Sequence, residues 1–272
     1  MNKESFLINL IKNKFIGDDG AVIGKWVYSS DIFAENSHFK RNWLGLKEIG
    51  YKAMIVNISD AIAMNADAKY ALVALSLPRS INPRQIEQIY IGIDEACERF
   101  GVKIIGGDTI SSDKISIAIT IISHTKKPIF RSGARAGDLI AFTGDLGESL
   151  KNLKTLKNGG QIGTHSRFKR PILKDKFMQK AGHFINSAMD ISDGLGVDMA
   201  KLVSASKLGV KFKKRLPKST LNSGEEYELL FTFAPKNLQK MRRIAQKTRT
   251  KINIFAKAMK GKFKYYARNH HF

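Results

Sequence analysis

The chain has 272 residues, of which 43% are hydrophobic and 26% are charged, and it carries a formal net charge of +22 at pH 7. These values predict a soluble globular protein of one large or two ordinary domains, and they exclude a disordered chain. No apolar run approaches the roughly 18–20 residues of a membrane span, and the N-terminus does not have the pattern of a signal peptide, so we expect a cytoplasmic protein without a membrane partner. The single cysteine, Cys97, excludes an internal disulfide and a thiolate metal cluster.

The positive charge is concentrated in the second half of the chain. Residues 1–140 carry 18 Lys and Arg against 15 Asp and Glu, a net charge of +3, whereas residues 141–272 carry 28 against 9, a net charge of +19. A basic surface can attract polyphosphates and RNA alike. The cations are mostly scattered and are not interleaved with aromatic residues, which favours a solvated face and makes nucleic acid an unlikely partner.

In the N-terminal part, residues 17–20 predict a turn and residues 21–28 a strand, which Ser29, Ser30 and Asp31 follow. Hydroxyls and a carboxylate at a strand end suit either a phosphate and metal site or an ordinary turn. A helix is predicted from about Gly45, and its apolar stripe is interrupted by Asp60. A carboxylate among small apolar residues is costly to bury unless it is paired or bound to metal.

A strand–helix–strand unit comes next. Residues 70–77 predict a strand, residues 83–100 a helix, and residues 102–105 a short buried strand that ends in the sequence GGDT. Glycine and a carboxylate at the end of the second strand are typical of ligand sites in α/β proteins. Residues 114–123 alternate as a further strand.

The second half repeats this mixed pattern, and we place the domain boundary near Ser132, giving domains 1–132 and 133–272. Strands are expected at 139–143, near Val210, at 227–233 and at 252–255, with a helix at about 235–246. The chain lacks the glycine-rich signatures of P-loop and dinucleotide-binding proteins and a protein-kinase signature. The fold class is therefore α/β (α+β) in two domains, outside the common nucleotide folds.

Residues 188–198, AMDISDGLGVD, place Asp190, Asp193 and Asp198 within a short stretch of this basic half. Asp190 is expected at a strand or loop end and Asp193 beside the N-terminus of a helix that runs to about Ala205. Two such carboxylates suit Mg²⁺ held together with substrate phosphates. The alternative is an ordinary helix start, in which Asp offsets the helix dipole without a metal. Both interpretations remain open on this stretch alone.

Taken together, the marked stretches resemble the thiamine-monophosphate kinases of the aminoimidazole-ribonucleotide synthetase superfamily. The motifs that carry the resemblance occur in the family's order: IGDDGAVI (16–23), SSDIF (29–33), HF (38–39), NISDAIAM (57–64), GGDT (106–109), GARAGD (133–138), TGDLGES (143–149), MDISDGLGVD (189–198) and SGEEYELLF (223–231).

The resemblance implies two α/β domains, with N-terminal mixed sheets that pair across a homodimer, and binding of Mg-ATP against acidic loops of the N-terminal domain. It implies the following roles for single residues. The metal ligands are Asp19, Ser29, Ser30, Asp31, Asp60, Asp108, Asp190 and Asp193, of which Asp108, Asp190 and Asp193 are also catalytic. ATP contacts are Gly107, Thr109, Arg135 and Ser192, and substrate contacts are His38, Phe39, Glu225 and Phe272.

The implied reaction is direct, in-line phosphoryl transfer from ATP to thiamine monophosphate, giving thiamine diphosphate, with several Mg²⁺ ions. The alternatives are a sister ATP-dependent activity of the same superfamily and, more remotely, a basic RNA-binding protein. The chain departs from the family pattern at Asn65 and Ala68, where glycine and proline are usual, and at Glu226, where aspartate is commoner. The segment between Leu216 and Ser223 is short, and Asn269 stands where a thiamine-stacking aromatic is expected.

Overall fold

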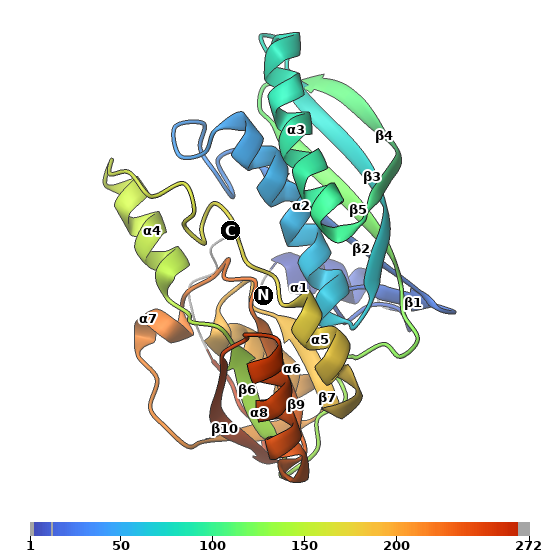
Figure 1. Ribbon diagram of the computed structural model, residues 1–272, viewed down its shortest axis with the longest axis vertical. Coiled ribbons are helices and arrows are strands. Elements are labelled where there is room, and N and C mark those ends of the chain that lie inside the picture. Colours follow the sequence, from blue (N-terminus) through green and yellow to red (C-terminus); the bar gives the residue numbers. More distant parts are fainter. Residues whose placement is uncertain (1–2, 12, 266–272) are drawn as a thin grey trace.

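The computed structural model describes residues 3–11 and 13–265. Its first half forms a mixed five-stranded sheet in the order β1-β2-β5-β3-β4. The strands are β1 (Ala21–Ile23), β2 (Trp26–Ala34), β3 (Asp67–Pro78), β4 (Lys103–Ser112) and β5 (Ser116–His124). The helices of this half are α1 (Lys3–Leu10), α2 (Leu46–Ala63) and α3 (Pro83–Phe100), and α2 and α3 lie side by side over one face of the sheet (Figure 1).

The sequence signals explain much of this half. Asn82 caps α3, since its side chain accepts a hydrogen bond from the backbone N–H of Gln85, and Pro83 begins the helix. Three expectations were wrong. Residues 29–31 and 106–109 were expected at strand ends, but they lie inside β2 and β4. The strand predicted over 21–28 is a hairpin, because Gly24, at φ +61°, turns the chain between β1 and β2. The short strand predicted over 102–105 was expected to be buried. It is part of β4, which is exposed along almost its whole length because it forms the edge of the sheet.

The second half forms another five-stranded sheet, in the order β7-β9-β6-β10-β8. Its strands are β6 (Leu139–Thr143), β7 (Ile185–Asp190), β8 (Leu208–Phe212), β9 (Leu229–Phe233) and β10 (Ile252–Lys260). Its helices are α4 (Glu148–Lys157), α5 (Asp175–Ala181), α6 (Leu195–Ala205), α7 (Lys218–Leu221) and α8 (Leu238–Lys247), with short 3₁₀ turns at Gly182–Phe184 and Pro235–Asn237. The fold class is thus mixed α/β with two sheets, as predicted.

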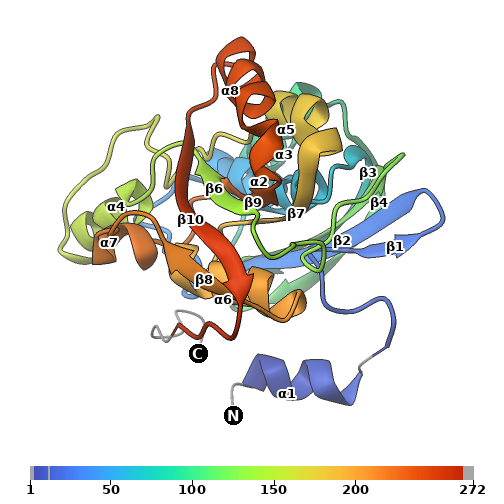
Figure 2. The ribbon, with the colours of Figure 1, turned by 90° about the horizontal axis from the view of Figure 1, so that it is seen from below.

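This second sheet is covered on both faces, which is why β6 and β9 are almost continuously apolar. On one face Phe231 and Phe233 pack in the cluster that includes Met241 of α8, and on the other Leu230 packs with Met199 of α6. Figure 2 shows α5 and α8 together, away from α6. The end of β7, which carries Asp190, is therefore held in a rigid layer.

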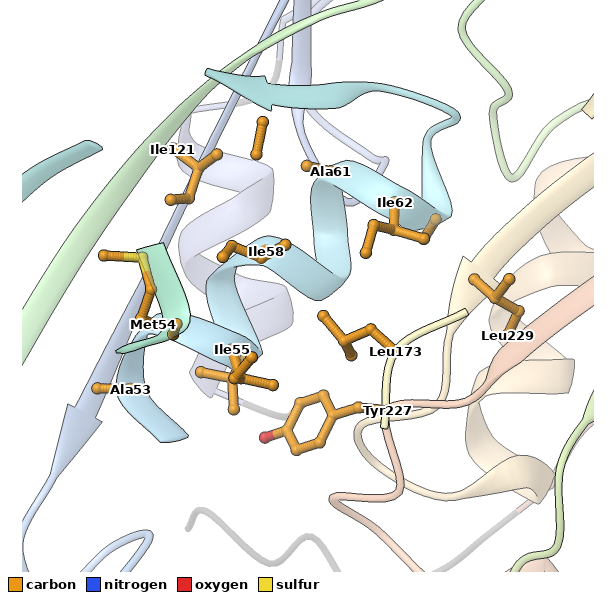
Figure 3. Close-up of a cluster of buried hydrophobic side chains, with 14 of the residues drawn as sticks. Ala53, Met54, Ile55, Ile58, Ala61, Ile62, Ile121, Leu173, Tyr227 and Leu229 are labelled. Carbon is orange, nitrogen blue, oxygen red and sulfur yellow. The ribbon is translucent and has the colours of Figure 1, made fainter. Parts of the chain in front are cut away.

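Helix α2 joins the two halves. Most of its length is buried, and its Ile55 and Ile62 belong to the same core cluster as Leu173, Tyr227 and Leu229 from the second half (Figure 3). Three polar side chains of this helix, Lys52, Asn57 and Ser59, are consequently buried. In the described part of the chain, no helix is long and apolar enough to cross a membrane.

Candidate active site

Three carboxylates from distant parts of the chain meet between the two halves. Asp19 lies in the turn before β1, Asp60 in the last turn of α2 and Asp190 at the end of β7. One oxygen from each carboxylate lies within 4.8 Å of those of the other two. Oxygen ligands at this separation suit a hard divalent cation such as Mg²⁺.

Two buried polar side chains of α2 hold the strands around this cluster. Asn57 accepts a hydrogen bond from the backbone N–H of Asp31 at 2.8 Å, and the hydroxyl of Ser59 donates to Asp190 at 2.8 Å. Asn57 and Asp60 are three residues apart and therefore lie on neighbouring positions of one helix face. The sequence NISD thus supplies both a carboxylate of the cluster and the groups that position β2 and β7 beside it.

The electrostatics of the cluster favour binding of a cation. Burial, together with the charges of Asp31 and Asp190, raises the pKa of Asp60 well above its usual value. Burial and then the nearby Asp19 raise the pKa of Asp190 to about 7. In addition, Oδ2 of Asp19 and the hydroxyl of Ser29 are buried without a hydrogen-bond partner in the described part of the structure. Carboxylates that repel one another and unsatisfied buried oxygens are what a bound cation would stabilise.

Arg131 contacts this cluster and was not identified from the sequence. Its guanidinium pairs with Asp19, with Nε 3.1 Å from Oδ1, and its backbone N–H donates to Asp18 at 2.6 Å. The guanidinium partly offsets the effect of burial, which raises the pKa of Asp19. The sequence signal that could have identified Arg131 is its position just before the GARAGD motif. The resemblance pointed instead to Arg135, which lies within that motif.

Arg135 lies at the opposite end of the second sheet from Asp190. It is exposed, in the turn that leads into β6, and its backbone N–H donates to Asp138 at 2.8 Å. The first residue of β6, Leu139, pairs with Phe233, which also pairs with Ile185 at the start of β7. Since β7 extends for five further residues, Asp190 is about 17 Å further along the sheet.

Asp108 also lies apart from the carboxylate cluster within a single chain. It pairs in register with Ala74 on β3, on the exposed face of the first sheet, whereas Asp31 meets Asn57 of α2 on the helix-covered face. The neighbouring Gly107 has a packing role, because a Cβ there would lie 1.7 Å from the carbonyl oxygen of Val73. Thr109 is exposed, and its backbone N–H donates to Asp108.

Ser29 and Ser30 point to opposite faces of the first sheet, as strand alternation requires. Ser29 is buried on the face that carries the cluster. Ser30 is exposed and forms a hydrogen bond of 3.0 Å with the hydroxyl of Thr120 on β5. Of these two predicted metal ligands, the structure brings Ser29 to the face with Asp31 and turns Ser30 away from it.

Asp193 and Asp198 have different surroundings. Asp193 pairs with Lys201 and lines a neighbouring pocket. Asp198 is buried and accepts hydrogen bonds from the backbone N–H groups of Asp193 and Gly194, at 3.1 and 2.9 Å. Asp198 therefore fixes the loop at the start of α6, which is the helix-start role, whereas Asp193 lines the pocket.

The pocket has a volume of about 380 Å³. It lies next to the carboxylate cluster along the chain, since Asp190 belongs to the cluster and Ser192 and Asp193 line the pocket. Its wall also contains two aromatic side chains, Trp43 and Phe168, whose rings meet edge to face at 6.5 Å. The other lining residues are Asn36, Ser37, His38, Lys40, Ser149, Leu150, Leu153, Lys157, Asn222, Gly224 and Glu225.

Four substrate contacts were predicted from the resemblance. His38 and Glu225 line this pocket. Phe39 is buried in the core, stacked on Phe33 with 4.9 Å between ring centroids, and is not a wall residue. Phe272, like Asn269, lies outside the described residues. Trp43 and Phe168 were missed because loop residues carry no periodic pattern that would place them at a site.

Comparison with known proteins identifies relatives of this chain by sequence and by fold. A family model for the N-terminal domain of AIR synthase related proteins matches residues 17–125. The thiamine-monophosphate kinase of Aquifex aeolicus is 33% identical over 260 residues, covering 83% of this chain and 84% of the relative. That of Bacillus subtilis is 30% identical over 248 residues, covering 80% and 76%. A solved structure, AaThiL complexed with AMPPCP and TMP, superposes with a TM-score of 0.85 at 27% identity, covering 95% of this chain and 90% of that one.

The two sheets and the acidic cluster between them thus define a protein of the AIR synthase related superfamily. A structure of the hydrogenase maturation protein HypE in complex with ATP shares this fold at 16% identity and a TM-score of 0.73. Within the superfamily, the chain belongs to the thiamine-monophosphate kinase family, which confirms the resemblance seen in the sequence.

Proposed function

We propose that this protein transfers a phosphoryl group from ATP to thiamine monophosphate, giving thiamine diphosphate. The observation that carries the proposal is the continuity of the acidic cluster with the pocket along residues 190–193, in a chain of this family. A ligand seated in the pocket through its heterocycle would direct its phosphate toward Asp190. The aromatic ring of Trp43 and the carboxylate of Asp193 suit a cationic thiazolium ring.

The cluster fits Mg²⁺, and Asp19, Asp60 and Asp190, with Asp31 beside them, would hold it. Bound there, Mg²⁺ would neutralise phosphate oxygens and align them for in-line transfer. The chain itself has to bring two polyanions together, and Arg131 adds a fixed positive charge next to Asp19. The acceptor phosphate is largely dianionic at pH 7, because its second ionisation lies near about pH 6, so the reaction needs no general base.

The ATP contacts remain predictions at Gly107, Thr109, Arg135 and Ser192, and Asp108 remains a predicted metal ligand. We also propose a homodimer that pairs the outer faces of the first sheets. Large apolar side chains are exposed on that sheet: Tyr28, Ile32, Tyr70, Leu72 and Ile110. Asp108 lies on the same face, where a second chain would meet it. Light scattering at micromolar concentration tests this proposal, and a strictly monomeric protein contradicts it.

A coupled assay of ADP release tests the activity. Thiamine monophosphate should support turnover, whereas thiamine and unrelated phosphomonoesters should give at least 100-fold lower kcat/KM, a difference of about 2.7 kcal/mol. Turnover with another small phosphate instead would favour the sister activity. Product analysis by phosphorus NMR should show thiamine diphosphate formed in equal amount to ADP.

A further inference from the structure

A positive charge is buried directly behind the pocket wall. Lys52 lies on α2, and its side chain is 0% exposed. Its ammonium donates to Oε2 of Glu225 at 2.9 Å, and the two residues are 173 positions apart in the chain. The same ammonium lies 4.0 Å from the centre of the Phe168 ring. Burying a lysine ammonium costs free energy unless its charge is compensated. Removal of the Glu225 carboxylate would therefore leave an uncompensated charge in the protein interior.

Lys52 therefore contacts two members of the pocket wall, Glu225 and Phe168, without lining the pocket itself. Phe168 in turn meets Trp43 edge to face. One helix residue from the first half of the chain thus supports two wall residues of the second half, and one of these, Phe168, contacts Trp43 of the first half.

Glu225 is held in an unusual backbone conformation. Its φ is +53°, in the left-handed region that residues with side chains seldom adopt, and its N–H donates to the carbonyl of Ser192 at 2.7 Å. Such a conformation persists only when several contacts determine it together. Here the Ser192 carbonyl fixes the backbone and Lys52 fixes the end of the side chain.

The ion pair uses only one of the two carboxylate oxygens. In the part of the chain that the structure describes, Oε2 of Glu225 accepts from Lys52, and no hydrogen bond is found to Oε1. The Glu225 side chain is 18% exposed, and the residue lines the pocket. A fixed carboxylate with a spare acceptor is suited to an N–H donor of a ligand.

We propose that Lys52 is a positioning residue for substrate recognition: it holds the Glu225 carboxylate in the pocket wall so that this carboxylate accepts a hydrogen bond from an amino group of the substrate's heterocycle. The inference rests on the proposed function, which supplies a substrate with an aminopyrimidine ring. It assigns Lys52 no contact with the substrate and no part in phosphoryl transfer.

The first test is Lys52→Met, which keeps the volume and the apolar stem but removes the charge. Because the carboxylate is then free to turn into water, KM for thiamine monophosphate should rise about tenfold, as expected for a hydrogen bond to a charged group. The values of kcat and of KM for ATP should stay within about twofold, since ground-state and transition-state binding are lost alike. Lys174→Met is the matched control, because Lys174 is also partly buried in an ion pair, with Glu228 at 3.3 Å, but does not contact the pocket.

A double-mutant cycle separates positioning from general loss of structure. Glu225→Gln should itself raise KM for thiamine monophosphate, and adding Lys52→Met to it should change that KM by less than about twofold, because Lys52 acts through the Glu225 carboxylate. Lys52→Arg, which keeps the charge, should give a smaller rise than Lys52→Met and serves if the methionine variant does not fold.

Three results would overturn the proposal: an unchanged KM in both Lys52 variants, an equal effect of Lys52→Met with and without Glu225→Gln, or an equal rise in both substrates' KM. Failure of the proposed function would look different, since the wild-type protein would then release no ADP and show no calorimetric binding of thiamine monophosphate.

Discussion

At the scale of single residues, the active-site cluster concentrates negative charge that the fold does not fully neutralise. Arg131 compensates Asp19, and the Ser59 hydroxyl satisfies one oxygen of Asp190. Burial and mutual repulsion nevertheless raise the pKa values of Asp19, Asp60 and Asp190. Such perturbed groups cluster at functional sites, where they are kept for ligand binding at the expense of stability.

Asp190→Asn should therefore lower kcat by at least 100-fold while leaving the metal-free protein folded. An amide can still accept the hydrogen bond from Ser59, and the substitution removes a repelling charge. Steady-state kinetics at saturating Mg²⁺ and the melting temperature without Mg²⁺ check the two halves of this prediction. Turnover like that of the wild type at limiting Mg²⁺ would exclude Asp190 from the metal site.

Cys97 behaves as a small core residue. It is 4% exposed in α3, and burial, with the charge of Asp94, raises the pKa of its thiol to about 11. A thiol reagent such as DTNB should consequently react with the native protein at pH 8 at least 100-fold more slowly than with the protein unfolded in urea. Rapid stoichiometric labelling of the folded protein would show that α3 opens readily.

At the scale of elements, α2 and α3 cross so closely that only glycine fits at the contact. A Cβ on Gly92 would lie 1.9 Å from the carbonyl oxygen of Lys47, and one on Gly50 would lie 2.0 Å from that of Ile89. Both obstacles are backbone atoms, which cannot move aside as a flexible side chain can. The position of Asp60 on α2 depends on this crossing.

Gly92→Ala should lower the free energy of unfolding by about 1–3 kcal/mol, because overpacking outweighs the gain in helix propensity. Gly163→Ala is a suitable control, since its Cβ would meet nothing within 4 Å and its stability should change by less than about 0.5 kcal/mol. Urea denaturation of both variants measures the difference. Equal stability would mean that the helices separate at little cost.

At the scale of the whole molecule, the two halves meet at an interface that carries the charged cluster, so stability and ligand binding are linked. Asp190 has a pKa of about 7 in the folded protein and an ordinary value near 3.8 when exposed. The folded state therefore holds this proton more tightly, and the stabilisation that it provides is lost as the pH rises toward and through 7.

The metal-free protein should thus be more stable at pH 6 than at pH 8, by about 1 kcal/mol from Asp190 alone. Mg²⁺ requires the ionised carboxylates, so its stabilising effect should be larger at pH 8 than at pH 6. Urea denaturation at both pH values, with EDTA or Mg²⁺, measures this, and Asp190→Asn should remove most of the pH dependence. A metal-free protein that is more stable at pH 8 would contradict the assignment.

The sequence by itself determined the family, the mixed α/β class and most of the elements, because motif residues, caps and apolar periodicity are local properties. Asn82 and Pro83 mark the start of α3, and the apolar run over 229–233 marks a strand buried on both faces. The sequence also identified Asp19, Asp60 and Asp190 as candidate metal ligands, since all three lie in the motifs that carry the family resemblance.

Only the tertiary structure decided which of these residues meet. Asp108 and Asp31 each follow two small residues but lie on opposite faces of one sheet, and Arg135 lies at the far end of the other. Arg131, Trp43, Phe168 and Lys52 reach the site through contacts between segments far apart in the chain. Strand order, sheet face and the burial of an ion pair depend on the packing of the two halves around α2, and no local pattern in the sequence encodes them.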